Sequence, residues 1–127
     1  MVIKTELTVN GYKATISPKL LLHKGDSVFL EITLMNTIIN TIEGVEVDEV
    51  LPMQFLKDVK LLLQNPNGVL KVESTEIEGN KAVFKLLPEH TQEVGTYLFQ
   101  LVCYDDDDCI FHIPEVQYTI KEPIGII

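Results

Sequence analysis

Four consecutive aspartates, Asp105–Asp108, are the densest group of potential ligand atoms in the sequence. Hard cations such as Ca²⁺ are bound by several carboxylate oxygens at once. The run, however, lacks the alternating spacing, the glycine and the distant glutamate of a helix–loop–helix calcium loop. Neighbouring residues in a chain also direct their side chains apart. A solvent-exposed hairpin tip is therefore the favoured interpretation, and a specific cation site is the alternative.

Two cysteines, Cys103 and Cys109, flank the aspartates. Their separation does not match a zinc-binding pair, which has about two to four intervening residues. If the flanking strands pair about a centre near Asp106, the cysteines face each other across the hairpin, within range of a disulfide bond. Two thiols that pack as small apolar side chains are favoured, and a disulfide formed in an oxidising compartment is the alternative.

The remaining residue types that support catalysis form no recognisable constellation. The histidines are His23, His90 and His112, and the serines considered as nucleophiles are Ser17, Ser27 and Ser74. No histidine has metal-ligand spacing to another ligand, and no serine has the glycines of a nucleophile elbow. Carboxylate pairs are uninformative in so acidic a chain. The sequence therefore predicts no catalytic, cofactor-binding or metal-binding residue, no cofactor and no enzymatic activity.

The charge balance excludes several classes of partner. The 127 residues include ten lysines, no arginine and 19 acidic residues, for a net charge of −9. Phosphate backbones and anionic lipid surfaces attract clustered Lys and Arg, so such a chain is repelled by both. No apolar run approaches the roughly 20 residues of a membrane span, and the first residues do not resemble a secretory signal. We therefore expect neither a nucleic acid nor a membrane as partner.

The elements that must position these residues follow a period of two. In Ser27–Met35, for example, apolar side chains alternate from Val28 to Leu34, as in a half-buried strand. The predicted strands are 2–9, 12–17, 27–36, 45–51, 57–64, 69–77, 81–87, 96–104 and 109–121. Residues 36–44 fit either a strand extension or a loop, and residues 52–57 fit one short helical turn. No segment has the pattern of a long amphipathic helix.

Turn residues separate the strands at intervals typical of a sandwich. Asn65-Pro66-Asn67-Gly68 has the proline and glycine of a tight turn, and Glu78-Gly79-Asn80 begins the next hairpin. Tyr97, after Gly95, is expected to pack its ring inside and bond its hydroxyl to a nearby loop. The pattern predicts an all-β, immunoglobulin-like antiparallel β-sandwich that spans residues 1–127 as a single domain.

The order of these motifs resembles the N-terminal domain of phage baseplate upper proteins, the BppU-like family. The resemblance covers about residues 20–124 and is carried by Gly25-Asp26, Asn65-Pro66-Asn67-Gly68, Ile77–Asn80 followed by Ala82–Leu86, Gly95-x-Tyr97, and Val116–Ile120 followed by Glu122-Pro123. The stretch from Asn36 to Leu56 is longer than the usual hairpin of that family. Family members continue into further domains, which implies that this domain is the N-terminal part of a longer protein.

The resemblance implies a structural component of a phage or prophage tail baseplate, a connector that anchors peripheral parts to the tail hub. Its partners would be other tail and baseplate proteins, with several copies in the particle, and its location would be the virion after assembly in the host cytoplasm. An adhesion or carbohydrate-binding module is the alternative. The expected contact surfaces are Val2–Val9 and Asn36–Pro52, the second of which contains Ile38, Ile39, Ile42, Val45 and Val47.

Overall fold

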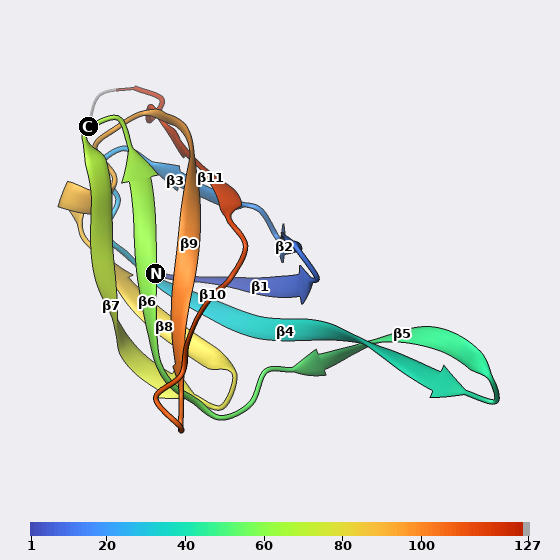
Figure 1. Cartoon of the computed structure of the whole chain (residues 1–127). Helices are drawn as coiled ribbons and strands as arrows, with labels where there is room; N and C mark the ends of the chain where they lie inside the picture. Colours follow the sequence, from blue (N-terminus) through green and yellow to red (C-terminus); the bar gives the residue numbers. More distant parts are fainter. Residues whose placement is uncertain (126–127) are drawn as a thin grey trace.

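The computed structural model describes residues 1–125, which are almost entirely β-structure (Figure 1). In chain order the elements are β1 Val2–Asn10, β2 Lys13–Ser17, β3 Leu20–His23, β4 Val28–Ile42, β5 Val45–Pro52, β6 Leu56–Asn65, β7 Gly68–Glu78, β8 Lys81–Leu86, the 3-10 turn η1 Pro88–His90, β9 Gly95–Asp105, β10 Ile110–His112 and β11 Val116–Lys121. The all-β prediction is confirmed. Within the described residues, no helix has the length and apolar character needed to cross a membrane.

The strands of the body are joined along one hydrogen-bonded path. Its order is β2-β1-β4-β8-β7-β6-β9-β11-β3, with β5 added to β4 and β10 added to β9. In Figure 1, β1 and β4 run horizontally and belong to one wall of the body, whereas β6, β7 and β9 run vertically and belong to the other. The strands of the two walls therefore cross at a steep angle. Strand β2, at one end of the path, approaches β11 near the other end. The body is therefore a nearly closed, barrel-like sheet.

Strand β7 forms the corner between the two walls. Its first part, up to Glu73, pairs with β6, and its last part, from Ser74, pairs with β8. The register shifts between Ser74 and Glu76, as expected where a bulge lets one strand pass from wall to wall. Between the walls lies one continuous apolar core, to which β4 contributes Val28, Leu30, Ile32 and Leu34.

The immunoglobulin-like antiparallel sandwich is not confirmed. Strand β1 pairs with β4 in parallel, and β3 pairs with β11 in parallel, so the sheet is mixed. The chain leaves β2 at Ser17 and reaches the opposite end of the path at Leu20. A period of two in the sequence reports which face of a strand is buried, but it does not report the direction of the neighbouring strand.

The structure departs from the sequence analysis at three places. The strand expected over 109–121 is divided into β10 and β11, with Pro114 in the gap, because proline has no N–H to continue a ladder. The short strand β3 was not predicted. Residues 52–57 form no helical turn: β5 ends at Pro52, Phe55 has a positive φ of 64°, and β6 begins at Leu56.

The structural role predicted for Tyr97 is confirmed. Its hydroxyl donates a hydrogen bond of 2.7 Å to the carbonyl oxygen of Val94, and its ring centroid lies 5.9 Å from that of Tyr118. Tyr118 is buried in the core, where its hydroxyl donates to the carbonyl oxygen of Gln64 at 2.7 Å. Burial of this phenol, with a smaller effect of Tyr97, raises the pKa of Tyr118 to about 12.

Candidate interaction surface

Strands β4 and β5 continue beyond the body as a two-stranded arm, defined here as residues 36–52 (Figure 1). Strand β1 accompanies β4 only as far as Asn36, which pairs with Val9. The register of the arm ends at the pair Ile42 and Val45, so that Glu43 and Gly44 form a two-residue turn. Their φ angles of 52° and 79° are those of a type I′ turn, which matches the twist of a hairpin. The ambiguous stretch 36–44 is therefore mainly strand.

One face of the arm is mainly aliphatic. Residues that oppose each other in an antiparallel pair lie on the same face, so the register places five aliphatic side chains together: Ile38, Ile42, Val45, Val47 and Leu51. Three polar residues, Asn36, Asn40 and Glu49, share this face. The face continues the face of β4 that is buried in the body, because side chains two residues apart share a face. Leu34 is fully buried, whereas Ile42 and Val45 are 57% and 61% exposed. The arm therefore carries part of the apolar pattern of the core out into solvent.

The opposite face of the arm carries two carboxylates. They are Glu46 and Asp48, which oppose Thr41 and Ile39 in the register, and the exposed aliphatic residues Ile39 and Val50 share this face with them. Glu43 lies at the tip, and Glu49, on the mainly aliphatic face, accepts a hydrogen bond from the Asn40 amide. The sequence from residue 34 to residue 56 contains no lysine, arginine or histidine. None of the ion pairs formed within residues 1–125 involves the arm.

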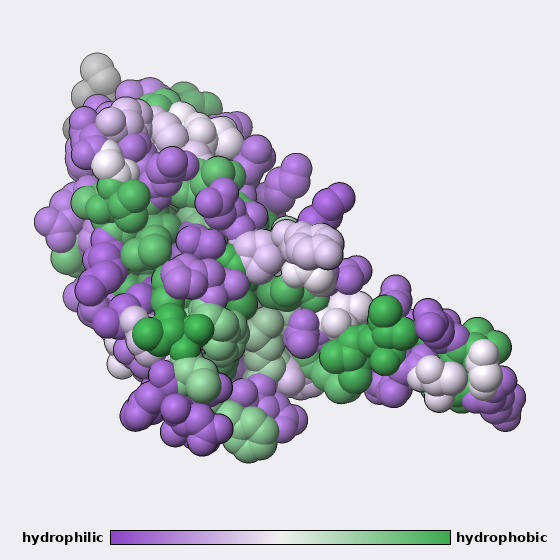
Figure 2. Space-filling view, viewed as in Figure 1, coloured by the Kyte–Doolittle hydropathy of each residue, from purple (hydrophilic) through white to green (hydrophobic). Residues whose placement is uncertain are grey.

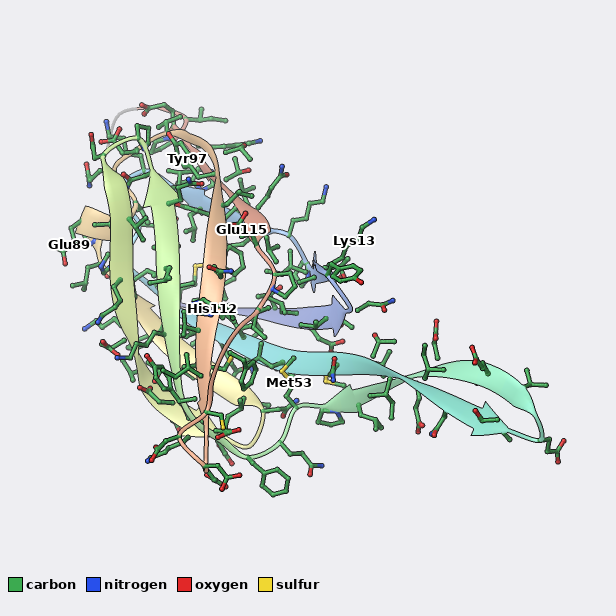
Figure 3. All side chains as sticks on the ribbon, viewed as in Figure 1. Lys13, Met53, Glu89, Tyr97, His112 and Glu115 are labelled. Carbon is green, nitrogen blue, oxygen red and sulfur yellow. The ribbon has the colours of Figure 1, made fainter. Side chains whose placement is uncertain are left out.

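A cavity of about 630 Å³ lies where the arm leaves the body. Its apolar lining comes from the arm, from the connection between β5 and β6, and from the segment around β10; the main contributors are Val9, Ile38, Leu51, Met53, Phe111 and Ile113. Figure 3 marks Met53 at the base of the arm and His112 on the adjacent β10, and both line the cavity. Figure 2 shows apolar surface both along the arm and at its base. The apolar face of the arm is thus continuous with this cavity.

A second cavity, of about 580 Å³, lies between the β1–β2 turn and the segment that joins β10 to β11. Its lining mixes apolar and polar groups, and the polar ones include Lys13, Gln100, His112 and Glu115; Figure 3 marks the first and the last two of these. Tyr12, in the turn at the rim, is 98% exposed. An exposed aromatic ring beside hydrogen-bonding groups can bind a ring-shaped ligand that has polar substituents and one apolar face.

The aspartate run forms the tip of the β9–β10 hairpin. The Asp105 carboxylate accepts hydrogen bonds from the backbone N–H groups of Asp107 and Cys109, both at 2.9 Å. Asp108 forms an ion pair of 2.7 Å with Lys57, and this hydrogen bond and charge raise the pKa of the Lys57 ammonium. Two of the four carboxylates therefore organise or anchor the tip.

The two cysteines do not face each other. Tyr104 pairs with Ile110 and Cys103 with Phe111, so the hairpin is centred one residue later than predicted. Both thiols are free: Cys103 is buried and Cys109 is exposed. Burial of Cys103 raises the pKa of its thiol to about 12, as expected for an inert core residue.

The histidines are spread over the molecule. His90 lies in η1, where its Nδ1 accepts a hydrogen bond of 2.8 Å from the backbone N–H of Leu87. His23 Nδ1 lies 4.0 Å from the Asp26 carboxylate, at the end of β3. His112 lines both cavities. Within residues 1–125, no three His, Cys, Asp or Glu side chains are grouped so as to hold a metal ion.

Of the two predicted contact surfaces, the structure exposes the second. From Glu6 onward β1 is paired on both sides, with β2 and with β4, so this half of Val2–Val9 is not a free edge. Ile39, Ile42, Val45 and Val47 of the other segment are exposed, and Ile38 is partly buried.

Sequence reasoning did not single out the exposed aromatic residues. Tyr12 is 98% exposed and Phe55 is 69% exposed, and Phe111 also reaches the surface. The glycine before Tyr12 was a usable signal, because a Gly-Tyr turn places the ring outside the ladder. Phe55 comes three residues after Pro52, where the alternation of apolar and polar residues is interrupted. Both features argue against a core position.

No protein-family model and no curated protein matches this chain. Among solved structures, its fold is similar to that of the N-terminal domain of phage TP901-1 ORF48, with a TM-score of 0.66 and 12% sequence identity. The similarity covers 94% of this chain and 98% of that domain. At such low identity the comparison shows a shared fold, and it extends over nearly the whole of both.

Proposed function

We propose that this chain is a structural component of a phage or prophage tail baseplate and acts there as a connector between peripheral parts and the tail hub. The observation that carries the proposal is the fold, shared over nearly full length with the N-terminal domain of a phage protein. The resemblance of the turn and strand order to BppU-like N-terminal domains supports the same role. One comparison uses sequence motifs and the other uses backbone shape.

In this role the domain acts through its surfaces and without catalysis, cofactor or metal. Its partners are other tail and baseplate proteins, it is present in several copies in the particle, and it resides in the virion after assembly in the host cytoplasm. The arm and the adjoining cavity support such a role, since exposed apolar faces of this kind mark protein contacts.

Purified phage particles test the proposal directly. We expect mass spectrometry to detect the chain in particles banded by density, at a stoichiometry comparable to that of other tail proteins. Gold-labelled antibodies raised against the domain should bind at the baseplate end of the tail. If the protein remains in the host cell and is absent from banded particles, the proposal is wrong.

The second cavity favours one other function, a carbohydrate-binding module. Tyr12 at its rim could stack on a sugar ring, while Lys13, Gln100 and Glu115 offer hydrogen bonds to hydroxyl groups. A glycan array with the purified domain would test this. Binding that is lost in Tyr12→Ala, but kept in Phe55→Ala, an exposed aromatic that does not line this cavity, would favour the carbohydrate function over the connector function.

A further inference from the structure

We propose that the arm inserts into a cleft of a second baseplate protein, one wall of which is apolar and the other of which carries lysine or arginine side chains. This inference rests on the proposed function, and it adds the contacting residues and the chemistry of the partner. The occupant of the cleft is the arm itself, residues 36–52, with its two unlike faces.

The apolar wall follows from the exposed aliphatic face. A two-stranded ribbon is at best marginally stable alone in water, and this one has no third strand or helix packed on it within residues 1–125. Even so, five aliphatic side chains line a single face, and that face runs into the apolar cavity at the base of the arm. A partner wall that covers Ile42, Val45 and Val47 would remove from water the apolar surface that the fold leaves uncovered.

The basic wall follows from the charges. The arm holds four carboxylates, Glu43, Glu46, Asp48 and Glu49, and no cation from residue 34 to residue 56 offsets them. Glu46 and Asp48 lie with Ile39 and Val50 on the face opposite the five aliphatic residues, among which Glu49 lies. A flat surface that meets the mainly aliphatic face would therefore leave Glu46 and Asp48 in solvent. A cleft contacts both faces. Lysine and arginine are the side chains that compensate carboxylates on desolvation.

A second copy of this chain does not fit the β5 edge of the arm. Two arms that pair along their β5 edges would bring eight carboxylates together, and like charges opposed across strands are destabilising. The net charge of −9 on each chain adds long-range repulsion. The charges of β5 also oppose addition of a foreign strand to its free edge, as they do on many edge strands. The faces, and not the edge, are therefore the contact.

Photo-cross-linking in assembled particles tests the apolar wall. Ile42 is replaced by photoreactive p-benzoylphenylalanine, and the same replacement at Val69, which is 62% exposed on β7, provides the control. We expect Ile42 to form a cross-link to a different protein of the particle, and Val69 to form at most a background signal. A cross-link from Ile42 to another copy of this chain, or no cross-link from chains that are present in the particle, would overturn the inference alone.

Charge reversal tests the basic wall. Glu46→Lys with Asp48→Lys should lower incorporation into particles at least about tenfold, as measured by quantitative mass spectrometry. The matched control is Glu76→Lys with Glu78→Lys, an exposed pair of the same spacing on β7, which should incorporate normally. Equal incorporation of both variants would contradict a basic wall. Absence of the unmodified chain from particles would instead overturn the proposed function, and the inference with it.

Discussion

The two halves of β4 have nearly the same sequence character and opposite surroundings. Val28, Leu30, Ile32 and Leu34 alternate with polar or half-exposed residues and are buried between the two walls of the body. Ile38 and Ile42 continue the same face, but Ile38 is only partly buried and Ile42 is exposed. The alternation of a strand therefore specifies which side chains share a face. Burial of that face depends on what the rest of the chain, or a partner, places against it.

The most direct test compares the same substitution at two isoleucines on one face of β4, Ile32 and Ile42. Ile32→Ala should lower the free energy of unfolding by about 2–5 kcal/mol, because Ile32 is fully buried and its removal leaves a cavity. Ile42→Ala, at a position 57% exposed, should change it by less than about 0.5 kcal/mol. Urea denaturation gives both values. Similar losses for the two variants would mean that the arm is packed in the isolated domain.

Alkaline pH should weaken the body through Tyr118. In the unfolded chain this phenol ionises near its ordinary pKa of 10, whereas in the fold burial raises the pKa to about 12. Between these values the unfolded state has lost a proton that the native state keeps, so the free energy of unfolding falls as pH rises, by up to about 1.4 kcal/mol per pH unit.

Tyr118→Phe should reduce this slope, and Tyr12→Phe, at an exposed position, should not. Denaturation at a series of pH values from 9 to 12 would measure it. Cys103, with a pKa raised by burial to about 12, contributes a slope of the same sign, so Cys103→Ala should flatten it further. A slope that is identical in all variants would contradict the assignment.

Two glycines sharpen the comparison between body and arm. At Gly95, with φ of 147°, a Cβ atom would lie 2.6 Å from the Tyr97 hydroxyl oxygen, so Gly95→Ala should cost about 1–3 kcal/mol of stability. At Gly44, with φ of 79°, no atom lies within 4 Å of such a Cβ. Gly44→Ala should loosen the tip of the arm and leave the thermal midpoint nearly unchanged, with NMR shift changes confined to the arm.

The smallest effect is expected from removal of the arm. Thr37 and Val50 are partners in the register, so residues 38–49 can be replaced by an Asn-Gly turn that joins them. Because residues 38–49 pair only with each other within residues 1–125, the melting temperature should shift by less than about 3 °C. A shift of 10 °C or more would show that the arm stabilises the body, so that the stabilities of arm and body are not independent.

The sequence predicted the strands well where the alternation was long, as in β4, β6 and β9. Hairpin turns with Asn, Gly and Pro were also placed correctly, because these residues favour turns for local reasons. The all-β class and the role of Tyr97 followed from such local signals. The arm was recognised as an unusual aliphatic stretch, and its exposed character agrees with the contact surface that the sequence predicted.

Features that depend on distant partners could not be predicted in this way. The parallel pairings of β1 and β3 are made with strands far along the chain, and no local pattern encodes them. The prediction that Cys103 and Cys109 face each other was wrong. The Asp105 carboxylate accepts hydrogen bonds from two backbone N–H groups of the tip, and the hairpin is centred one residue later than predicted. Both cavities are formed by segments from different parts of the sequence, so the local sequence pattern could not predict them.

The continuity of β4 determines how a load on the arm would be transmitted. The strand that forms the arm also runs through the middle of the sheet, bonded to β1 along one edge and to β8 along the other. A pull along the arm therefore loads these two ladders in shear, so that many hydrogen bonds must yield together and not one after another. A separate hairpin on a flexible linker would peel away bond by bond. A load on the arm would thus be borne by the two ladders that hold β4 in the domain.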